Sequence, residues 1–97
     1  KNMTQFKDLK FKNHHGGINT HHVFDNDWKI SVTAGKMAYC NPREDDLDSS
    51  AYSSFEVAVL NPAGDFATGE LLQSVDDVVG WCGRDDINNI MAMVADQ

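Results

Sequence analysis

The chain has 97 residues, of which 41% are hydrophobic and 24% are charged, and its formal net charge is −7. These values are typical of one folded domain spanning 1–97 and exclude a disordered chain. No apolar run approaches the roughly 20 residues of a membrane helix or resembles a secretion signal, so we expect a cytoplasmic protein without membrane contact. Met3 is expected to be the native start, with Lys1 and Asn2 left over from expression.

The first third of the chain predicts strands. Residues 5–12 are expected to form a strand, with a helix as the alternative, because their apolar residues do not alternate cleanly. Residues 18–24 and 28–33 predict a hairpin, since apolar and polar residues alternate along 28–33 with the period of a half-buried strand. The connecting residues 25–27 are Asp and Asn, whose side chains bond their own backbone and favour turns.

The middle of the chain predicts further strands around a long loop. Residues 37–40 are expected to form a short strand, and the polar, acidic residues 43–54 are expected to form the longest loop. Residues 55–60 alternate well and are partly apolar on their second face, so they predict a central strand. A turn at 61–65 then precedes a possible short last strand at 66–68.

The last third of the chain predicts helices. Ser74 followed by Asp77 is an approximate capping box, and it predicts a short helix that ends near Gly80. Asp85 or Asp86 is expected to cap a second helix, whose apolar residues recur at helical spacing. These apolar residues are Ile87, Ile90, Met91 and Val94. We therefore expect an α+β fold, an antiparallel sheet of about four or five strands followed by two short C-terminal helices packed on it.

The cysteines and histidines do not predict a metal site. Cys40 and Cys82 are expected to be buried, reduced residues, with a disulfide as the alternative. The histidine pairs at 14–15 and 21–22 match no zinc pattern, and His21 and His22, as neighbours in a strand, are expected to point to opposite faces and so cannot bind one ion together. We expect polar edge and loop residues here, and no cofactor.

No motif indicates a reaction, so we do not expect an enzyme. The sequence contains no nucleophile motif with a matching base and no phosphate-binding glycine loop. The acidic run at 44–48 lacks the glycine and the following bidentate glutamate of a calcium loop. The lysines and phenylalanines of 5–12 are a weak basic patch against a charge of −7, so direct nucleic-acid binding is not expected.

Charge is distributed unevenly along the chain. Residues 1–36 hold six lysines against three aspartates, whereas residues 37–97 hold two arginines against twelve acids. A concentrated negative field repels nucleic acid and membranes and attracts basic proteins, including those that hold nucleic acid. The predicted partner-binding residues are the acids of the long loop and of the two helix starts, with one aromatic anchor; Phe55 is expected in the core. They are Glu44, Asp45, Asp46, Asp48, Tyr52, Asp76, Asp77, Asp85 and Asp86.

The segments FEVAVLNPAGDF (55–66) and SVDDVVGWCGRDDINNIM (74–91) contribute most to a family resemblance. In size, charge and element order the chain resembles small phage-encoded inhibitors of host defence, of which anti-CRISPR proteins are the best-known group. These inhibitors share no sequence motif, so the resemblance assigns no residues. It implies a protein that binds a bacterial nuclease complex, often at a basic surface meant for DNA.

The leading hypothesis is a non-enzymatic inhibitor that docks acidic residues on a basic, DNA-handling surface, such as that of a CRISPR effector complex, in the host bacterial cytosol. It would act as a monomer or a homodimer. The first alternative is a phage or bacterial assembly protein that binds through a sheet edge or through the helix at 85–95. The second alternative is a small enzyme or metal protein that uses the histidines.

Overall fold

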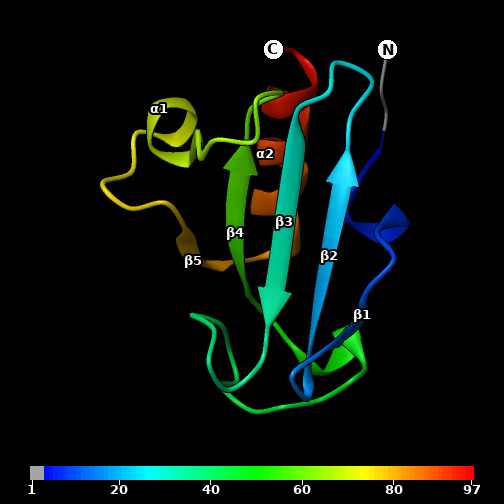
Figure 1. Ribbon diagram of the computed structural model, residues 1–97. Coiled ribbons are helices and arrows are strands. Elements are labelled where there is room, and N and C mark those ends of the chain that lie inside the picture. The colour runs from blue at the N-terminus through cyan, green and yellow to red at the C-terminus, as the bar shows by residue number, and fades with distance from the viewer. Residues whose placement is uncertain (1–3) are drawn as a thin grey trace.

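The computed structural model describes residues 4–97 and shows a five-stranded antiparallel sheet with a long helix across one face (Figure 1). The strands are β1 (Lys12–His14), β2 (Gly17–Val23), β3 (Lys29–Ala34), β4 (Phe55–Leu60) and β5 (Val79–Cys82), and they pair in chain order. The helices are α1 (Thr68–Leu72) and α2 (Arg84–Ala95), with short 3-10 turns η1 (Phe6–Asp8) and η2 (Ser49–Ala51). The predicted α+β fold is confirmed. The predicted start at Met3, after Lys1 and Asn2, lies outside the described residues.

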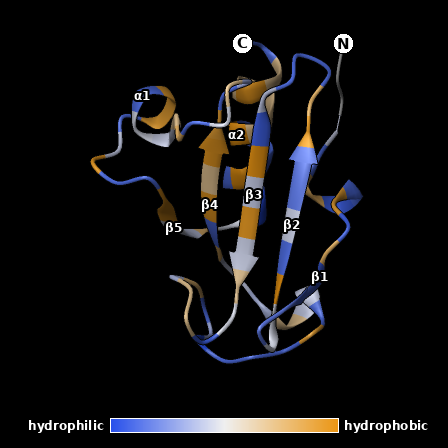
Figure 2. Ribbon diagram, viewed as in Figure 1, coloured by the Kyte–Doolittle hydropathy of each residue, from blue (hydrophilic) through white to orange (hydrophobic). Residues whose placement is uncertain are grey.

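The core lies between the sheet and α2. Ile30 and Val32 of β3 pair with Val59 and Val57 of β4, and all four side chains are fully buried. Figure 2 shows β4 hydrophobic over most of its length and β2 mostly hydrophilic. The helix contributes its predicted apolar stripe, and this expectation is confirmed by burial of all four members. They are Ile87, Ile90, Met91 and Val94.

An aromatic cluster joins the N-terminal segment, the long loop and α2. The Phe55 ring lies 5.0 Å from the Phe6 ring, and the Arg84 guanidinium lies over both rings. Arg84 also donates hydrogen bonds to the carbonyl oxygens of Tyr52 (2.9 Å) and Ser49 (3.0 Å). Since the guanidinium satisfies two loop carbonyls and stacks on the core, one side chain fixes the loop to the helix.

The predicted hairpin and its turn are confirmed. β2 and β3 pair from Ile18↔Ala34 to Val23↔Lys29, and the turn between them is closed by the Phe24 N–H bond to the Trp28 carbonyl (2.8 Å). The Asn26 amide then donates to the carbonyl of Val94 at 2.9 Å. This bond satisfies one of the free carbonyls at the C-terminal end of α2, so the turn also positions the helix.

Two predicted strands in the first half of the chain are wrong in part. Residues 5–12 form η1 and only the start of β1. The Asp8 N–H donates to the Gln5 carbonyl (2.9 Å) and the Gln5 N–H donates to the Asp8 carboxylate (3.0 Å), and these two bonds close a short turn. Residues 37–40 form no strand. The Ala38 N–H bonds back to the Gly35 carbonyl, and the Cys40 thiol donates to the same carbonyl, so this segment folds into a compact turn.

The predicted helix from Ser74 to Gly80 is also wrong. Residues 79–82 form β5 instead, with Val79 opposite Val57 and Cys82 opposite Phe55. Pairing with the exposed edge of β4 satisfies backbone groups that an isolated short helix would leave free, and valines suit a strand. The first helix of the chain is instead α1, which begins at Thr68. The short strand predicted at 66–68 does not form, and Phe66 makes only an isolated bridge to Leu60.

Several smaller expectations are settled by the same geometry. Residues 43–54 form the long loop, and both Cys40 and Cys82 are buried and unpaired, as predicted. The helix α2 begins at Arg84 with Gly83 as its N-cap, two residues earlier than an N-cap at Asp85 would require. The Asp86 carboxylate caps the helix from its third position by accepting the Gly83 N–H at 2.9 Å. Within residues 4–97, every helix is too short or too polar to span a lipid bilayer.

Replacing Ile87 with Ala tests the assigned core. Ile87 is fully buried under the sheet, so Ile87→Ala should lower the free energy of unfolding by about 2–5 kcal/mol. The control is Met93→Ala on the same helix, because Met93 is 41% exposed and its loss should cost less than about 0.5 kcal/mol. Chemical denaturation of both variants measures the difference. Equal effects would mean that α2 does not pack as described.

Candidate functional site

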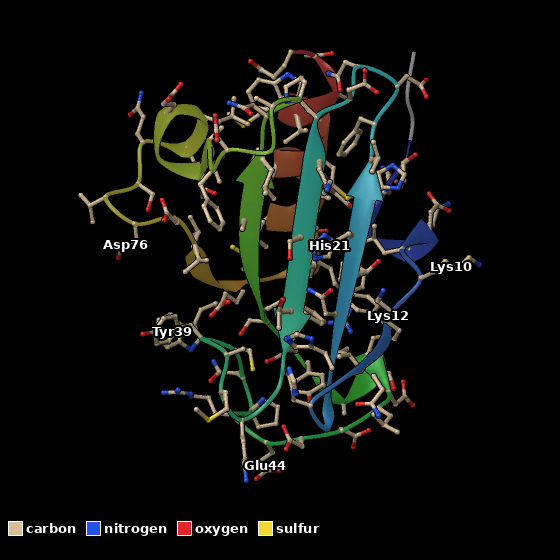
Figure 3. The ribbon with its side chains drawn as sticks, in the orientation of Figure 1. Lys10, Lys12, His21, Tyr39, Glu44 and Asp76 are labelled. Carbon is tan, nitrogen blue, oxygen red and sulfur yellow. The ribbon has the colours of Figure 1, made fainter. Side chains whose placement is uncertain are left out.

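The predicted acidic residues are all exposed, but they occupy three separate places. Glu44 and its neighbours lie on the loop that crosses the lower end of the sheet in Figure 3. Asp76 and Asp77 lie on the connection between α1 and β5, and not at a helix start as predicted. Asp85 and Asp86 occupy the first turn of α2. The structure therefore does not gather these acids into one cluster.

We call the loop at 43–54 together with the β5 side, where Asp76 and Asp77 lie, the acidic side of the molecule, and the β1 side its lysine-bearing side. Figure 3 shows Lys10 and Lys12 on the β1 side of the molecule, whereas Tyr39 and Asp76 project from the β5 side and Glu44 from the lower end. The topology contributes to this separation, because strands that pair in chain order spread the sequence across the sheet. The acidic loop does not follow that order, since it runs back to the β1–β2 turn, where Asp45 lies next to Gly16.

The acidic loop is held in a defined shape by its own carboxylates. Asp45 accepts the Lys36 N–H, Asp46 accepts the Asp48 N–H, and Asp48 accepts the Ser50 N–H, each at 2.9 Å. The bond from Ser50 lowers the pKa of the Asp48 carboxyl. Each of these three acids therefore orders the loop through one carboxylate oxygen while staying exposed to a partner. A loop that is already ordered loses less conformational entropy when it binds.

Tyr52 does not anchor a partner, and this prediction is wrong. The side chain is only 2% exposed, and its hydroxyl donates to the Glu44 carbonyl (2.7 Å) and accepts the Asp46 N–H (2.8 Å). Burial raises the pKa of the Tyr52 phenol. Tyr52 thus supports the acidic loop from below, and Phe55 beside it is core as expected.

An exposed aromatic pair, Tyr39 and Trp81, takes the place of the predicted anchor. The two side chains are 46% and 53% exposed, and their ring centroids lie 5.4 Å apart. The Arg43 guanidinium lies 5.5 Å from the centroid of the Tyr39 ring. Trp, Tyr and Arg are the residue types most enriched among those that dominate binding energy at protein interfaces. The sequence does not predict this pair, because its local pattern favours a strand at Tyr39 and a connection between two helices at Trp81.

The backbone holds this aromatic pair in place. Trp81 has a φ of 53°, a left-handed conformation that a bulky side chain rarely adopts, and its N–H donates to the Tyr39 carbonyl at 2.9 Å. A Cβ at Gly80 would lie 2.6 Å from the Tyr39 Cβ, so only glycine permits this approach. The Tyr39 N–H in turn donates to a Glu56 carboxylate oxygen at 3.1 Å. Backbone positions with strained conformations are common at functional sites. At Trp81 the left-handed conformation leaves the indole exposed to solvent.

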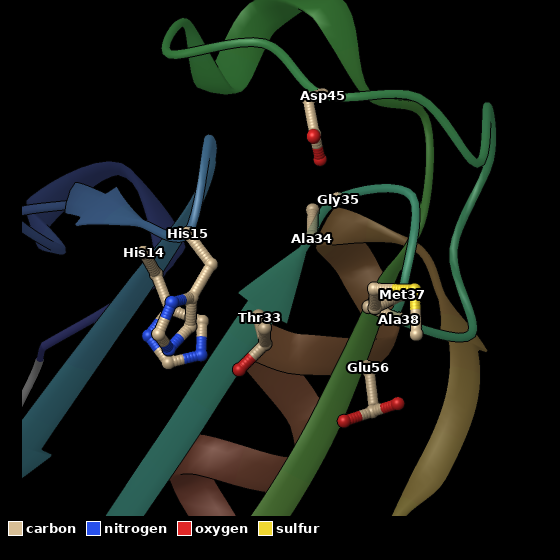
Figure 4. Close-up of a pocket in the computed structure, with 9 residues that line it drawn as sticks. All are labelled: His14, His15, Thr33, Ala34, Gly35, Met37, Ala38, Asp45 and Glu56. Atoms are coloured by element: carbon tan, nitrogen blue, oxygen red, sulfur yellow. The ribbon is translucent and has the colours of Figure 1, made fainter.

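A cavity of about 270 Å³, lined by both polar and apolar side chains, lies on the face of the sheet away from α2 (Figure 4). The rings of His14 and His15 enter it from one side, and Asp45 and Glu56 border it from others. Both carboxylates already accept backbone N–H groups of the loop at 36–39. The hydroxyl of Thr33, also in the lining, accepts the Asn19 amide at 2.8 Å. Asp45 and Glu56 in the lining therefore stabilise the loop at 36–39. The lining residues do not pair a nucleophile with a base that could activate it.

His21 and His22 lie on different faces of the sheet, as expected. His22 faces the core, where its ring packs on Phe24 at 4.7 Å, while His21 lies on the opposite face beside Lys12 and Lys29. In the part of the chain that the structure describes, no three His, Cys, Asp or Glu residues come together as metal ligands.

Comparisons with protein-family models, with curated proteins and with solved structures find no match for this chain. The site must therefore be interpreted from its own chemistry.

Replacing Trp81 with Gly separates stability from function. Trp81→Gly relieves the left-handed strain, worth about 1 kcal/mol, but loses the Tyr39 contact and the partial burial of the indole, so the free energy of unfolding should fall by no more than about 2 kcal/mol. The control is Trp28→Gly, because Trp28 packs against the core and its loss should cost about 3 kcal/mol or more. Large destabilisation by Trp81→Gly would show that the indole serves the fold.

The pKa of His21 gives a test of the lysine-bearing face. Burial and the nearby charges of Lys29, Lys12 and His14 hold this pKa below its ordinary value of 6.5. The unfolded chain then binds more protons than the folded one, so stability should fall as the pH drops below about 6.5, with no effect from His21 well above it. Titration of the imidazole by NMR should give a higher pKa in Lys29→Met, whereas the control Lys36→Met should leave it unchanged.

Proposed function

We propose that this protein is a non-enzymatic inhibitor that binds a basic, nucleic-acid-handling protein of a bacterial defence nuclease complex. The observation that supports this proposal best is the exposed, pre-shaped acidic loop next to the Tyr39–Trp81 pair. The acidic side attracts and orients a basic surface during diffusion, and the aromatic pair supplies contact area that excludes water. Bound there, the protein blocks nucleic acid by occupying its site.

The chemistry of the acidic side favours protein over nucleic acid as the partner. Glu44, Asp46 and Asp48 can accept charge-assisted hydrogen bonds from lysine and arginine, and they repel phosphate. The protein would act in the bacterial cytosol as a monomer, since a net charge of −7 opposes self-association. A CRISPR effector complex is a partner of the required kind.

The sheet edges support the alternative of an assembly protein less well. The β5 edge is covered in part, because Trp81 bonds to the Tyr39 carbonyl. The β1 edge is three residues long and carries Lys12, and short charged edges resist pairing with another strand. The acidic side therefore remains the better-supported contact.

Affinity capture from a nuclease-treated bacterial lysate tests the proposal. The wild-type chain should retain a basic nucleic-acid-handling protein at low salt and release it at about half-molar salt, where the Debye length is only about 4 Å. Added DNA should compete for the captured protein. Trp81→Gly, which is expected to stay folded, should capture much less.

Two variants of equal net charge show which acids bind. The first carries Glu44→Gln, Asp45→Asn, Asp46→Asn and Asp48→Asn, whose amides keep the acceptor oxygens of the loop. The second carries Asp25→Asn, Asp27→Asn, Asp65→Asn and Glu70→Gln, all at exposed positions outside the loop. Only the first should lose the partner. Capture that survives high salt and both variants would contradict electrostatic docking and favour the assembly protein.

A further inference from the structure

A second concavity, which we call the Trp81 groove, lies between α1, β5 and α2 and has a volume of about 470 Å³. Its apolar lining includes Leu72, Val79, Trp81 and Ile90. Trp81 therefore contacts the Tyr39 ring and also forms part of the wall of this groove. The groove extends the candidate contact surface from the acidic loop towards α2.

One carboxylate gives the Trp81 groove a negative charge. Asp86 contributes to the lining, and none of the lining residues is a base. The Oδ2 atom of Asp86 accepts the Gly83 N–H, whereas Oδ1 receives no hydrogen bond from the described part of the chain. The negative charge of Asp86 also affects the neighbouring Cys82 thiol, which lies in the same lining. Burial raises the pKa of this thiol to about 11, and the Asp86 carboxylate contributes to the rise. One oxygen is therefore available to a cationic ligand.

We infer that the Trp81 groove receives an arginine side chain of the partner protein. The apolar stem of arginine would pack against Val79 and Ile90, its planar guanidinium would stack on the Trp81 indole, and its N–H groups would reach Asp86. The partner comes from the proposed function, but the preference of the groove for arginine does not depend on it.

The chain itself shows that its aromatic surfaces hold guanidinium groups. Arg43 lies over the Tyr39 ring, and Arg84 lies between the carbonyls of the loop and the rings of Phe6 and Phe55. A wholly apolar ligand would remove water from Asp86 without replacing its hydrogen bonds, which is unfavourable. An anion would be repelled by the same carboxylate. Lysine would keep the charge but lose the planar stacking.

Peptide binding followed by NMR tests the inference without knowledge of the partner. The probe is acetyl-Ala-Leu-Arg-Leu-Ala-amide, and the matched peptides carry citrulline, which has the same shape without the charge, or lysine. The arginine peptide should shift the Trp81 indole signal saturably with a dissociation constant in the millimolar range, and the citrulline peptide should bind roughly tenfold more weakly. The signal of Trp28 should not move, and Trp81→Gly identifies which signal is which.

Asp86→Asn and Asp65→Asn provide the decisive pair of variants. The side-chain amide that Asp86→Asn introduces keeps an acceptor for the Gly83 N–H, so the helix cap and the fold should survive, and melting curves verify this. Asp86→Asn should abolish the preference for arginine over citrulline, whereas Asp65→Asn, outside the groove, should leave it intact.

Absence of a saturable shift, equal binding of the arginine and citrulline peptides, or an unchanged preference in Asp86→Asn would overturn the inference. Failure of lysate capture with normal peptide binding would reject the nuclease partner and retain the groove. The reverse result would reject the groove and retain the acidic loop as the contact.

Discussion

The pairing of every strand with its neighbour in sequence is the constraint on which the other features depend. In such a sheet, order along the chain is order across the molecule. Lys10, Lys12 and Lys29 therefore lie on the β1–β3 side, and Asp76 and Asp77 lie near β5. The acidic loop is the exception, because it runs back beneath the sheet and brings Asp45 next to Gly16, between β1 and β2. A fold with crossover connections would have mixed the two groups and weakened the field that the proposed function uses.

The acidic loop and the hydrophobic core are stabilised by the same side chains. Tyr52 is buried against Phe55 and holds the loop backbone through its hydroxyl, while Arg84 joins loop carbonyls to two core rings. A loop of a dozen polar residues would ordinarily be mobile. Here its carboxylates are presented from a supported backbone, so binding would lose little conformational entropy.

At the Tyr39–Trp81 pair, tertiary contacts override the backbone conformation that the local sequence prefers. A left-handed Trp81 and a glycine pressed against Tyr39 both cost free energy, and neither buries the indole. The arrangement places an exposed, rigid aromatic pair between the acidic loop on one side and the Trp81 groove on the other. Large aromatic side chains that a fold leaves exposed at such a conformational cost are good candidates for partner contacts.

The sequence alone determined the features that depend on local periodicity and composition. The hairpin of β2 and β3, the strand β4, the stripe from Ile87 to Val94 and the exposure of the acidic loop could all be predicted, because each follows from spacing or polarity within a few residues. Only the tertiary structure decided that 79–82 is a strand, because its partner is β4, some twenty residues earlier. The same holds for the site: Tyr52 is buried and Tyr39 meets Trp81 through contacts between distant segments, which no local pattern encodes.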